Sequence, residues 1–239
     1  MSGAPDSPRY PSLRGILGQL GWVGASQVLT AAARFLILVI VARTLSPSEF
    51  GSFAFFVGCA LVVGNLAELS LGRTLVRFVG VAHGEQNPAL AKQFSVAVLQ
   101  TKILLSVPIL AIGLIAIGFA RTSLNASLGL CALAVGLLTS FGPLVASVFQ
   151  VQGRFRQYFL AYSIDAVRFA AILGLLILGR VTVRNLLFVY LVSPVVLALL
   201  WPAMGLKLGA LIEATSVATY RHLWTFGKWI FLIPLQKGP

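Results

Sequence analysis

Three basic residues, Arg34, Lys102 and Arg168, lie inside stretches of sequence that are otherwise almost entirely apolar. Counting along the expected helices at about 1.5 Å per residue puts these cations about 18, 12 and 17 Å from the helix starts. A charge at that depth in a bilayer costs about a few kcal/mol, so such residues face a bundle interior or a water-filled cavity and tend to be functional. Guanidinium groups bind phosphate oxygens through paired hydrogen bonds, so the chemistry indicated is recognition of an anion.

Polar neighbours share helix faces with these cations. Gln27 and Thr30 precede Arg34 at helical spacing, and Asp165 lies three residues before Arg168. Asp165 satisfies one arginine, which leaves a second cation at the same depth without an acidic partner. We therefore predict a cationic cavity that binds a phosphate-bearing lipid through four residues: Arg34, Arg168, Lys102 and Gln27.

The same residues also have a purely structural interpretation. Asp165 and Arg168 can neutralise each other, and Lys102 can snorkel to the cytoplasmic surface. Glu68 is a poor partner for Arg34, because it lies roughly 15 Å away along the membrane normal. Glu68 either closes a surface salt-bridge cluster with the next loop or, like Asp165, is a candidate for gating or coupling to a proton or Na⁺.

The elements that must position these residues are apolar helices. Of the 239 residues, 58% are hydrophobic and only 10% are charged, against about a quarter charged in soluble domains. Mean hydropathy is +0.94. A helix needs roughly 20 apolar residues to cross a bilayer. We predict an all-α, polytopic transmembrane bundle with the start of a seventh helix near Leu223 and six full spans, at 20–43, 50–70, 94–119, 124–149, 157–179 and 185–206.

The basic residues orient this bundle. Cytoplasmic segments carry an excess of lysine and arginine, so the N-terminus is predicted to be cytoplasmic. Residues 1–19 then form a cytoplasmic segment, 20–206 the six-helix bundle, and 207–239 a cytoplasmic connection with an incomplete seventh helix. On this orientation the cytoplasmic side has ten cations (Arg9, Arg14, Arg73, Arg77, Lys92, Arg154, Arg156, Lys207, Arg221, Lys228) and the outer side four (Arg43, Arg121, Arg180, Arg184).

Several function classes are disfavoured. The net charge of +12 is scattered between apolar segments and forms no basic patch, so nucleic-acid binding is not expected. Cys59 and Cys131 lie in apolar stretches without metal-ligand spacing, so neither a metal nor a disulfide is expected. His83 and His222 lie in predicted cytoplasmic loops without a paired carboxylate, so we expect no enzyme activity and no cofactor.

Two segments resemble a known family. VARTLSPSEFGSFAF (41–55) and NLAELSLGRTLVRF (65–78) are similar to the opening of polysaccharide flippases, the O-antigen and exopolysaccharide translocases of the multidrug/oligosaccharidyl-lipid/polysaccharide exporter superfamily. The shared features are an arginine at the end of the first helix, a Pro-acidic-aromatic-Gly turn, and an acidic residue before a leucine-glycine turn and a basic pair. Glu68 and Ser70 stand where many members have Asp and Gly.

The resemblance implies transport without covalent chemistry. Such proteins move an undecaprenyl-diphosphate-linked oligosaccharide from the cytoplasmic to the outer leaflet by alternating access between two six-helix bundles, through a cationic cavity. The implied partners are this polyprenyl-diphosphate-linked oligosaccharide and membrane lipids, and the implied location is the inner (cytoplasmic) membrane. One bundle is present here, so the chain resembles an N-terminal half that is either truncated or pairs with another copy or a separate second half.

Two alternatives to a flippase remain. One is a multidrug or small-molecule exporter of the same fold, although a cationic cavity would repel organic cations. The other is a non-transporting half protein that serves as a membrane scaffold. Substitution of Arg34 and Arg168 separates the scaffold from a flippase.

Overall fold

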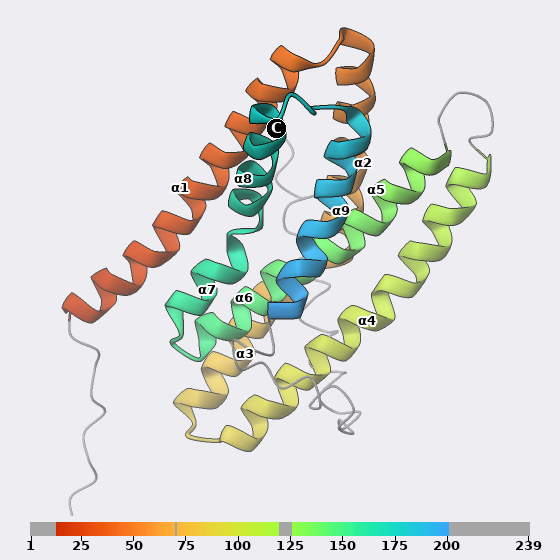
Figure 1. Ribbon diagram of the computed structural model, residues 1–239. Coiled ribbons are helices and arrows are strands. Elements are labelled where there is room, and N and C mark those ends of the chain that lie inside the picture. The colour runs from red at the N-terminus through yellow and green to blue at the C-terminus, as the bar shows by residue number, and fades with distance from the viewer. Residues whose placement is uncertain (1–12, 70, 120–125, 201–239) are drawn as a thin grey trace, which may run out of the picture.

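Helices account for all regular structure in the described part of the chain. The computed structural model describes residues 13–69, 71–119 and 126–200, and these ranges contain no strand. The prediction of an all-α fold is confirmed. Figure 1 shows the helices in order: α1 (Leu13–Thr44), α2 (Pro47–Glu68), α3 (Leu71–Gly84), α4 (Pro88–Phe119), α5 (Ala126–Thr139), α6 (Phe141–Val151), α7 (Phe155–Tyr162), α8 (Ile164–Ile177) and α9 (Val183–Leu200).

Three of the predicted spans are interrupted helices. α2 gives way to α3 at Leu69, whose backbone is left-handed with φ 39°. α5 gives way to α6 at Ser140, and α7 to α8 at Ser163 with a bend of 46°. Within the described ranges five helical segments are long and apolar enough to cross a membrane, or six if α7 and α8 form one span. This agrees with a bundle of about six spans, while the cytoplasmic location of the N-terminus stays a prediction.

The second predicted span differs from the structure at its end. We expected a span at 50–70 followed by a connection, but the chain continues as the amphipathic helix α3. Leu75 and Val79 of α3 are buried, while Arg73 and Arg77 are exposed. The apolar positions recur at helical spacing, so this basic segment packs as a helix despite its charges.

Some predictions fall outside the described residues. These are most of the N-terminal segment, the predicted connection at 120–123 with the first two residues of the fourth span, the end of the sixth span and the incomplete seventh helix near Leu223.

The start of α2 has a local cause. The backbone N–H of Ser46 donates to Oε2 of Glu49 at 3.1 Å, as in a capping box, and Pro47 occupies the first helical turn. Proline suits that position because its missing N–H would have no helical partner there. The SPSEF motif is therefore a helix-start signal.

Two close crossings hold the interrupted helices together in pairs. A Cβ built on Gly136 of α5 would lie 2.6 Å from the Ala60 carbonyl oxygen of α2, so only glycine allows this approach. A Cβ on Gly72 of α3 would lie 2.7 Å from Oγ of Ser147 on α6. Small residues at helix contacts let backbones approach closely in membrane proteins. As a result α2 packs along α5 and α3 packs along α6.

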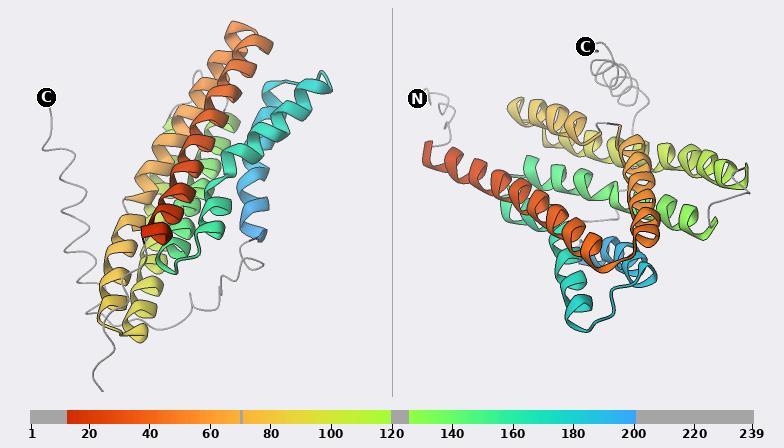
Figure 2. Two further views of the ribbon diagram at one scale, coloured as in Figure 1. Left: turned by 90° about the vertical axis from the view of Figure 1, so that its left-hand side faces the viewer. Right: turned by 90° about the horizontal axis from the view of Figure 1, so that it is seen from above.

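The hydrophobic core is divided at the level of the helix breaks. One cluster joins α3, α6 and the first part of α4, with Leu75, Val98 and Leu144 fully buried. Another joins α2, α5, α8, α9 and the end of α1, with Val41 and Phe56 fully buried. In Figure 1, α3, α6 and α7 lie in the lower part of the view and α2, α5 and α8 in the upper part. Both views in Figure 2 show α1 running along most of the length of the bundle.

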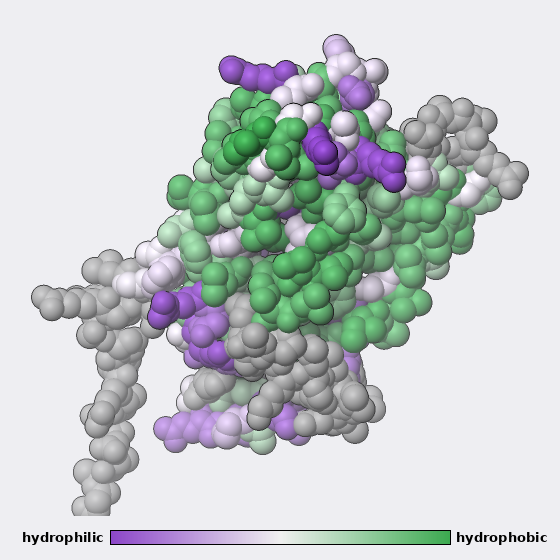
Figure 3. All heavy atoms as spheres, viewed as in Figure 1, coloured by the Kyte–Doolittle hydropathy of each residue, from purple (hydrophilic) through white to green (hydrophobic). Residues whose placement is uncertain are grey.

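The outer surface is apolar over the middle of the bundle. Phe35, Leu104 and Ile112 are examples of large hydrophobic side chains that are mostly exposed. Figure 3 shows apolar residues covering the middle of the visible face and hydrophilic residues gathered toward its two ends. This distribution is that of a membrane protein, in which lipid replaces water around the middle.

Candidate functional site

A cavity of about 230 Å³ lies where the three helix breaks come together. Helix breaks leave backbone groups unpaired, and in a membrane such groups occur where they are buried in protein or line a wet cavity. The lining comes from α1, α2, α5, α6, α7 and α8, and its polar or charged members are Thr30, Arg34, Asn65, Glu68, Thr139, Ser140, Tyr162, Asp165 and Arg168.

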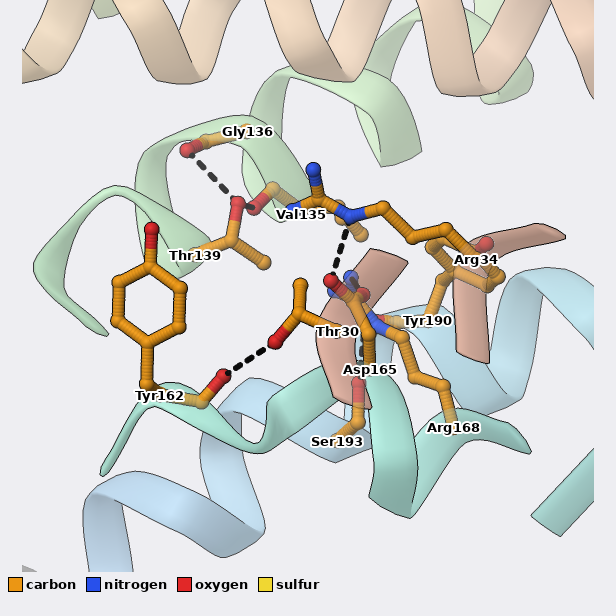
Figure 4. A network of polar contacts seen from close by, with 10 residues as sticks. All are labelled: Thr30, Arg34, Val135, Gly136, Thr139, Tyr162, Asp165, Arg168, Tyr190 and Ser193. Atoms are coloured by element: carbon orange, nitrogen blue, oxygen red, sulfur yellow. Dashed lines mark hydrogen bonds and ion pairs between the residues drawn. The ribbon is translucent and has the colours of Figure 1, made fainter. Parts of the chain in front are cut away.

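One aspartate holds two arginines at this cavity. Nε of Arg34 donates to Oδ2 of Asp165 at 2.7 Å, and Nη1 of Arg168 donates to Oδ1 of the same carboxylate at 2.9 Å. Figure 4 shows both guanidinium groups converging on this carboxylate. The side chain of Asp165 is 3% exposed and that of Arg168 is 7% exposed, whereas 61% of the Arg34 side chain is exposed. The cluster therefore has one buried half and one open half.

The buried arginine is fixed on several sides. Nε of Arg168 donates to Oγ of Ser193 on α9 at 2.9 Å, and the guanidinium lies 4.3 Å from the ring centroid of Tyr190. Nη2 of Arg168 is buried and has no hydrogen-bond acceptor among the described residues. Buried donors are nearly always paired, so this unused donor is an exception within the site.

This geometry corrects one part of the sequence reasoning. We expected Asp165 to satisfy one arginine and to leave the other without an acidic partner. In the structure Asp165 pairs with both Arg34 and Arg168. The three-residue cluster carries one net positive charge, and Glu68 adds a second carboxylate to the cavity wall, so the cationic cavity stays a prediction.

A hydroxyl and a free carbonyl connect α1 to the break between α7 and α8. Oγ1 of Thr30 donates to the backbone oxygen of Tyr162 at 3.5 Å. Tyr162 is the last residue of α7, so its carbonyl oxygen has no partner further along that helix. Thr30 and Arg34, one turn apart, therefore both face the α7–α8 junction, as their shared helix face indicated.

Lys102 occupies a different place from either expectation. Its side chain is fully buried, and Nζ donates to the Ala67 backbone oxygen and to Oγ of Ser140, both at 2.6 Å. The ammonium also lies 5.1 Å from the ring centroid of Phe141. It does not snorkel to the surface, and it is absent from the cavity lining. Lys102 instead joins two of the helix breaks.

Of the other predicted site residues, Glu68 lines the cavity and Gln27 does not. Glu68 is part of the cavity wall with Arg34, although the depth count placed the two levels roughly 15 Å apart. The break at Leu69 explains this, because α2 ends at Glu68 inside the bundle. Gln27 is exposed next to Tyr158 and lies outside the lining.

Sequence reasoning did not find Ser193 and Tyr190, which position Arg168 from α9. The only local signal is Pro194, which follows Ser193 inside α9. Proline interrupts helical hydrogen bonding and exposes the preceding turn. The contact itself joins residues 25 positions apart, and no helical spacing predicts it.

The described ranges contain no group of three or more His, Cys, Asp or Glu residues that could hold a metal ion.

The family model for polysaccharide biosynthesis proteins matches residues 16–232, which is nearly the whole chain. The chain belongs to this family. No curated protein and no solved structure shows a significant match to it.

For a polysaccharide biosynthesis protein, this site has a clear chemical character. The match at family level agrees with the resemblance that residues 41–55 and 65–78 carry. The member described here is a helical membrane protein with a polar cavity inside an apolar bundle. Arg34, Asp165 and Arg168 together carry one net positive charge, and a second carboxylate, Glu68, lies in the same cavity wall.

Proposed function

We propose that this protein is a flippase that moves a polyprenyl-diphosphate-linked oligosaccharide across the inner (cytoplasmic) membrane during cell-surface polysaccharide biosynthesis. The observation that carries the proposal is the pair of arginines that shares Asp165, with the open guanidinium of Arg34 and the unpaired Nη2 of Arg168. An anion with several oxygens is the ligand that both groups can bind at once.

Helix ends add to the attraction for an anion. The first turn of α6 contributes Gly142 and Pro143 to the cavity wall, and the first turn of α8 contributes Ile164 and Asp165. The N-terminus of a helix carries roughly half a positive charge and has free N–H groups. The diphosphate would therefore meet both arginine side chains and helix N-termini.

The size of the cavity sets what it can hold. Ligand pockets that enclose a whole small molecule are usually about 300 Å³ or larger. A cavity of about 230 Å³ suits the diphosphate and the groups next to it, but not a full oligosaccharide. Hydroxyl and amide groups of Asn65, Thr139 and Ser140 offer hydrogen bonds to a sugar attached to the phosphate.

The proposed transport involves no making or breaking of covalent bonds. The polyprenyl tail stays in lipid next to the apolar outer surface, and the diphosphate crosses the bilayer next to the arginines. Asp165 competes with the diphosphate for both guanidinium groups, which keeps binding weak enough for release. Another copy of the chain or a separate second half would complete the transport path.

Membrane vesicles from cells that carry each variant in place of the native protein test the proposal. The measurement is exposure of a labelled polyprenyl-diphosphate oligosaccharide on the outer leaflet. Arg34→Ala and Arg168→Ala are expected to abolish transport while the protein remains inserted. Arg43→Ala is the matched control, because Arg43 is an exposed arginine in the last turn of α1. Transport that persists in both single variants and in the double variant would rule out the cationic cavity.

Binding separates this function from the alternatives. Polyprenyl diphosphate and inorganic pyrophosphate are expected to compete for the wild-type protein, and an organic cation is not. Competition by the organic cation alone would favour an exporter of the same fold. Absence of binding by any of these ligands, with correct insertion, would favour a scaffold.

A further inference from the structure

Lys102 joins two interruptions in neighbouring helices. Its ammonium donates to the Ala67 carbonyl oxygen, which is released by the end of α2, and to the hydroxyl of Ser140, which separates α5 from α6. The hydrogen-bond chain continues into α5, because Oγ of Ser140 donates to the backbone oxygen of Leu137 at 2.6 Å. α4, which carries Lys102, runs past both breaks as one helix.

The ammonium is enclosed by protein groups. It donates to the oxygens of Ala67 and Ser140, and Nζ lies 5.1 Å from the centroid of the Phe141 ring. A lysine whose donors are used in this way is not available to bind a phosphate. The function of Lys102 therefore follows from the two helix breaks that it connects.

The breaks separate two packed bodies. Each interrupted span gives one helix to the core that contains Phe56 and Val41, and the other helix to the cores that contain Leu75 or Phe149. α2, α5 and α8 belong to the first body, whereas α3, α6 and α7 belong to the second. Figure 1 shows the two groups stacked along the bundle. Packed cores move as rigid bodies, so relative motion concentrates at the residues between them.

We propose that Leu69, Ser140 and Ser163 form a hinge layer, and that Lys102 is a positioning residue that couples the first two hinges so that they bend together. The residues next to all three hinges line the cavity, so bending about this layer changes the shape of the arginine site. The role in transport rests on the proposed function, whereas the coupled hinge does not.

The decisive variant is Lys102→Met, which fills similar space without the charge or the two hydrogen bonds. Hydrogen exchange of the full chain in lipid nanodiscs is the first measurement. The amides of Leu69 and Ser140, which donate to Asn65 and Gly136, are expected to exchange at least about tenfold faster. Peptides from the middles of α3 and α5 are expected to keep the wild-type rate. Lys102→Arg, which retains a charged donor, is expected to restore most of the protection.

Two further variants test the connection itself. Ser140→Ala removes one acceptor and is expected to loosen the α5–α6 break more than the α2–α3 break. Adding Ser140→Ala to Lys102→Met is expected to change little further, because residues in one network are not additive. Ser95→Ala is the matched control on α4, where it removes only a hydroxyl bond to the backbone oxygen of Ala91 in the same helix.

The second measurement separates positioning from ligand binding. Lys102→Met is expected to bind polyprenyl diphosphate within about twofold of the wild-type affinity but to transport it at least about tenfold more slowly. Unchanged exchange at both breaks, or faster exchange throughout every helix, would overturn the coupled hinge. Loss of diphosphate binding in this variant would make Lys102 a ligand and overturn its role as a positioning residue. Failure of the wild-type protein to bind diphosphate would overturn the proposed function alone, since the exchange result still decides the hinge.

Discussion

Arg34 and Asp165 are 131 positions apart in the chain, and their side chains meet with 2.7 Å between Nε and Oδ2. The contact joins α1 to the start of α8. Asp165 is buried and Arg34 is mostly exposed, and both line the cavity. Asp165 also pairs with Arg168. If Arg34 moves away, the buried carboxylate therefore keeps one ion-pair partner. The open arginine is therefore the more easily exchanged of the two, and the following predictions depend on this asymmetry.

The two arginines are expected to differ in their contributions to stability. Arg34→Ala should lower the free energy of unfolding by about 1 kcal/mol or less, because Asp165 keeps its buried partner. Arg168→Ala should cost about 3 kcal/mol or more, because it removes a buried ion pair and the contact with Tyr190. Thermal unfolding of the purified proteins measures the difference. Equal losses of unfolding free energy in the two variants would contradict this difference between Arg34 and Arg168.

Asp165→Asn is expected to strengthen anion binding. The change raises the net charge of the cluster from one positive charge to two, and a competitor for both guanidinium groups is lost. Pyrophosphate affinity should rise at least about tenfold. Transport should fall, because the anion is released more slowly. Competition binding provides the measurement.

A matched carboxylate provides the control for this charge change. Glu49→Gln alters the exposed start of α2, away from the cavity, and should leave affinity unchanged. An unchanged or lower affinity in Asp165→Asn would contradict competition between the carboxylate and the ligand.

Ser193→Ala is expected to disturb the site through Arg168. The variant leaves Nε of Arg168 without its acceptor, so the guanidinium is free to turn. Diphosphate affinity should fall by about fivefold to tenfold, in proportion to one hydrogen bond to a charged group. Ser52→Ala, which removes an exposed hydroxyl on α2, should have no effect. Wild-type affinity in the Ser193 variant would mean that Tyr190 alone orients the arginine.

Gly136→Ala is expected to push α2 and α5 apart. Its methyl group would lie 2.6 Å from a backbone oxygen of Ala60, which cannot move aside as a flexible side chain can. Overpacking of this kind costs about 1 to 3 kcal/mol. Gly58→Ala on α2 points into open space and should be neutral in the same thermal-unfolding experiment. Equal stability of both variants would contradict the tight crossing.

Hydropathy predicts the helices well because membrane spans need long uncharged segments whatever their tertiary contacts. The i, i+3 spacing of Asp165 and Arg168 indicated that the two could neutralise each other, and they form an ion pair. The helix breaks were less accessible. The chain breaks at Ser140, just before Gly142 and Pro143, and proline is tolerated in the first turn of the new helix.

The sequence by itself determined the solvent, the helical class, the family motifs and the presence of three intramembrane cations. These features depend on local composition and on residue spacing along a single helix, so they can be read from the sequence without knowing any tertiary contact. Only the tertiary structure decided that Asp165 serves both arginines and that Ser193 orients one of them. It also decided that Lys102 bridges two helix breaks and does not line the cavity. Those outcomes depend on which helix faces meet, and close packing at positions such as Gly136 helps to decide this.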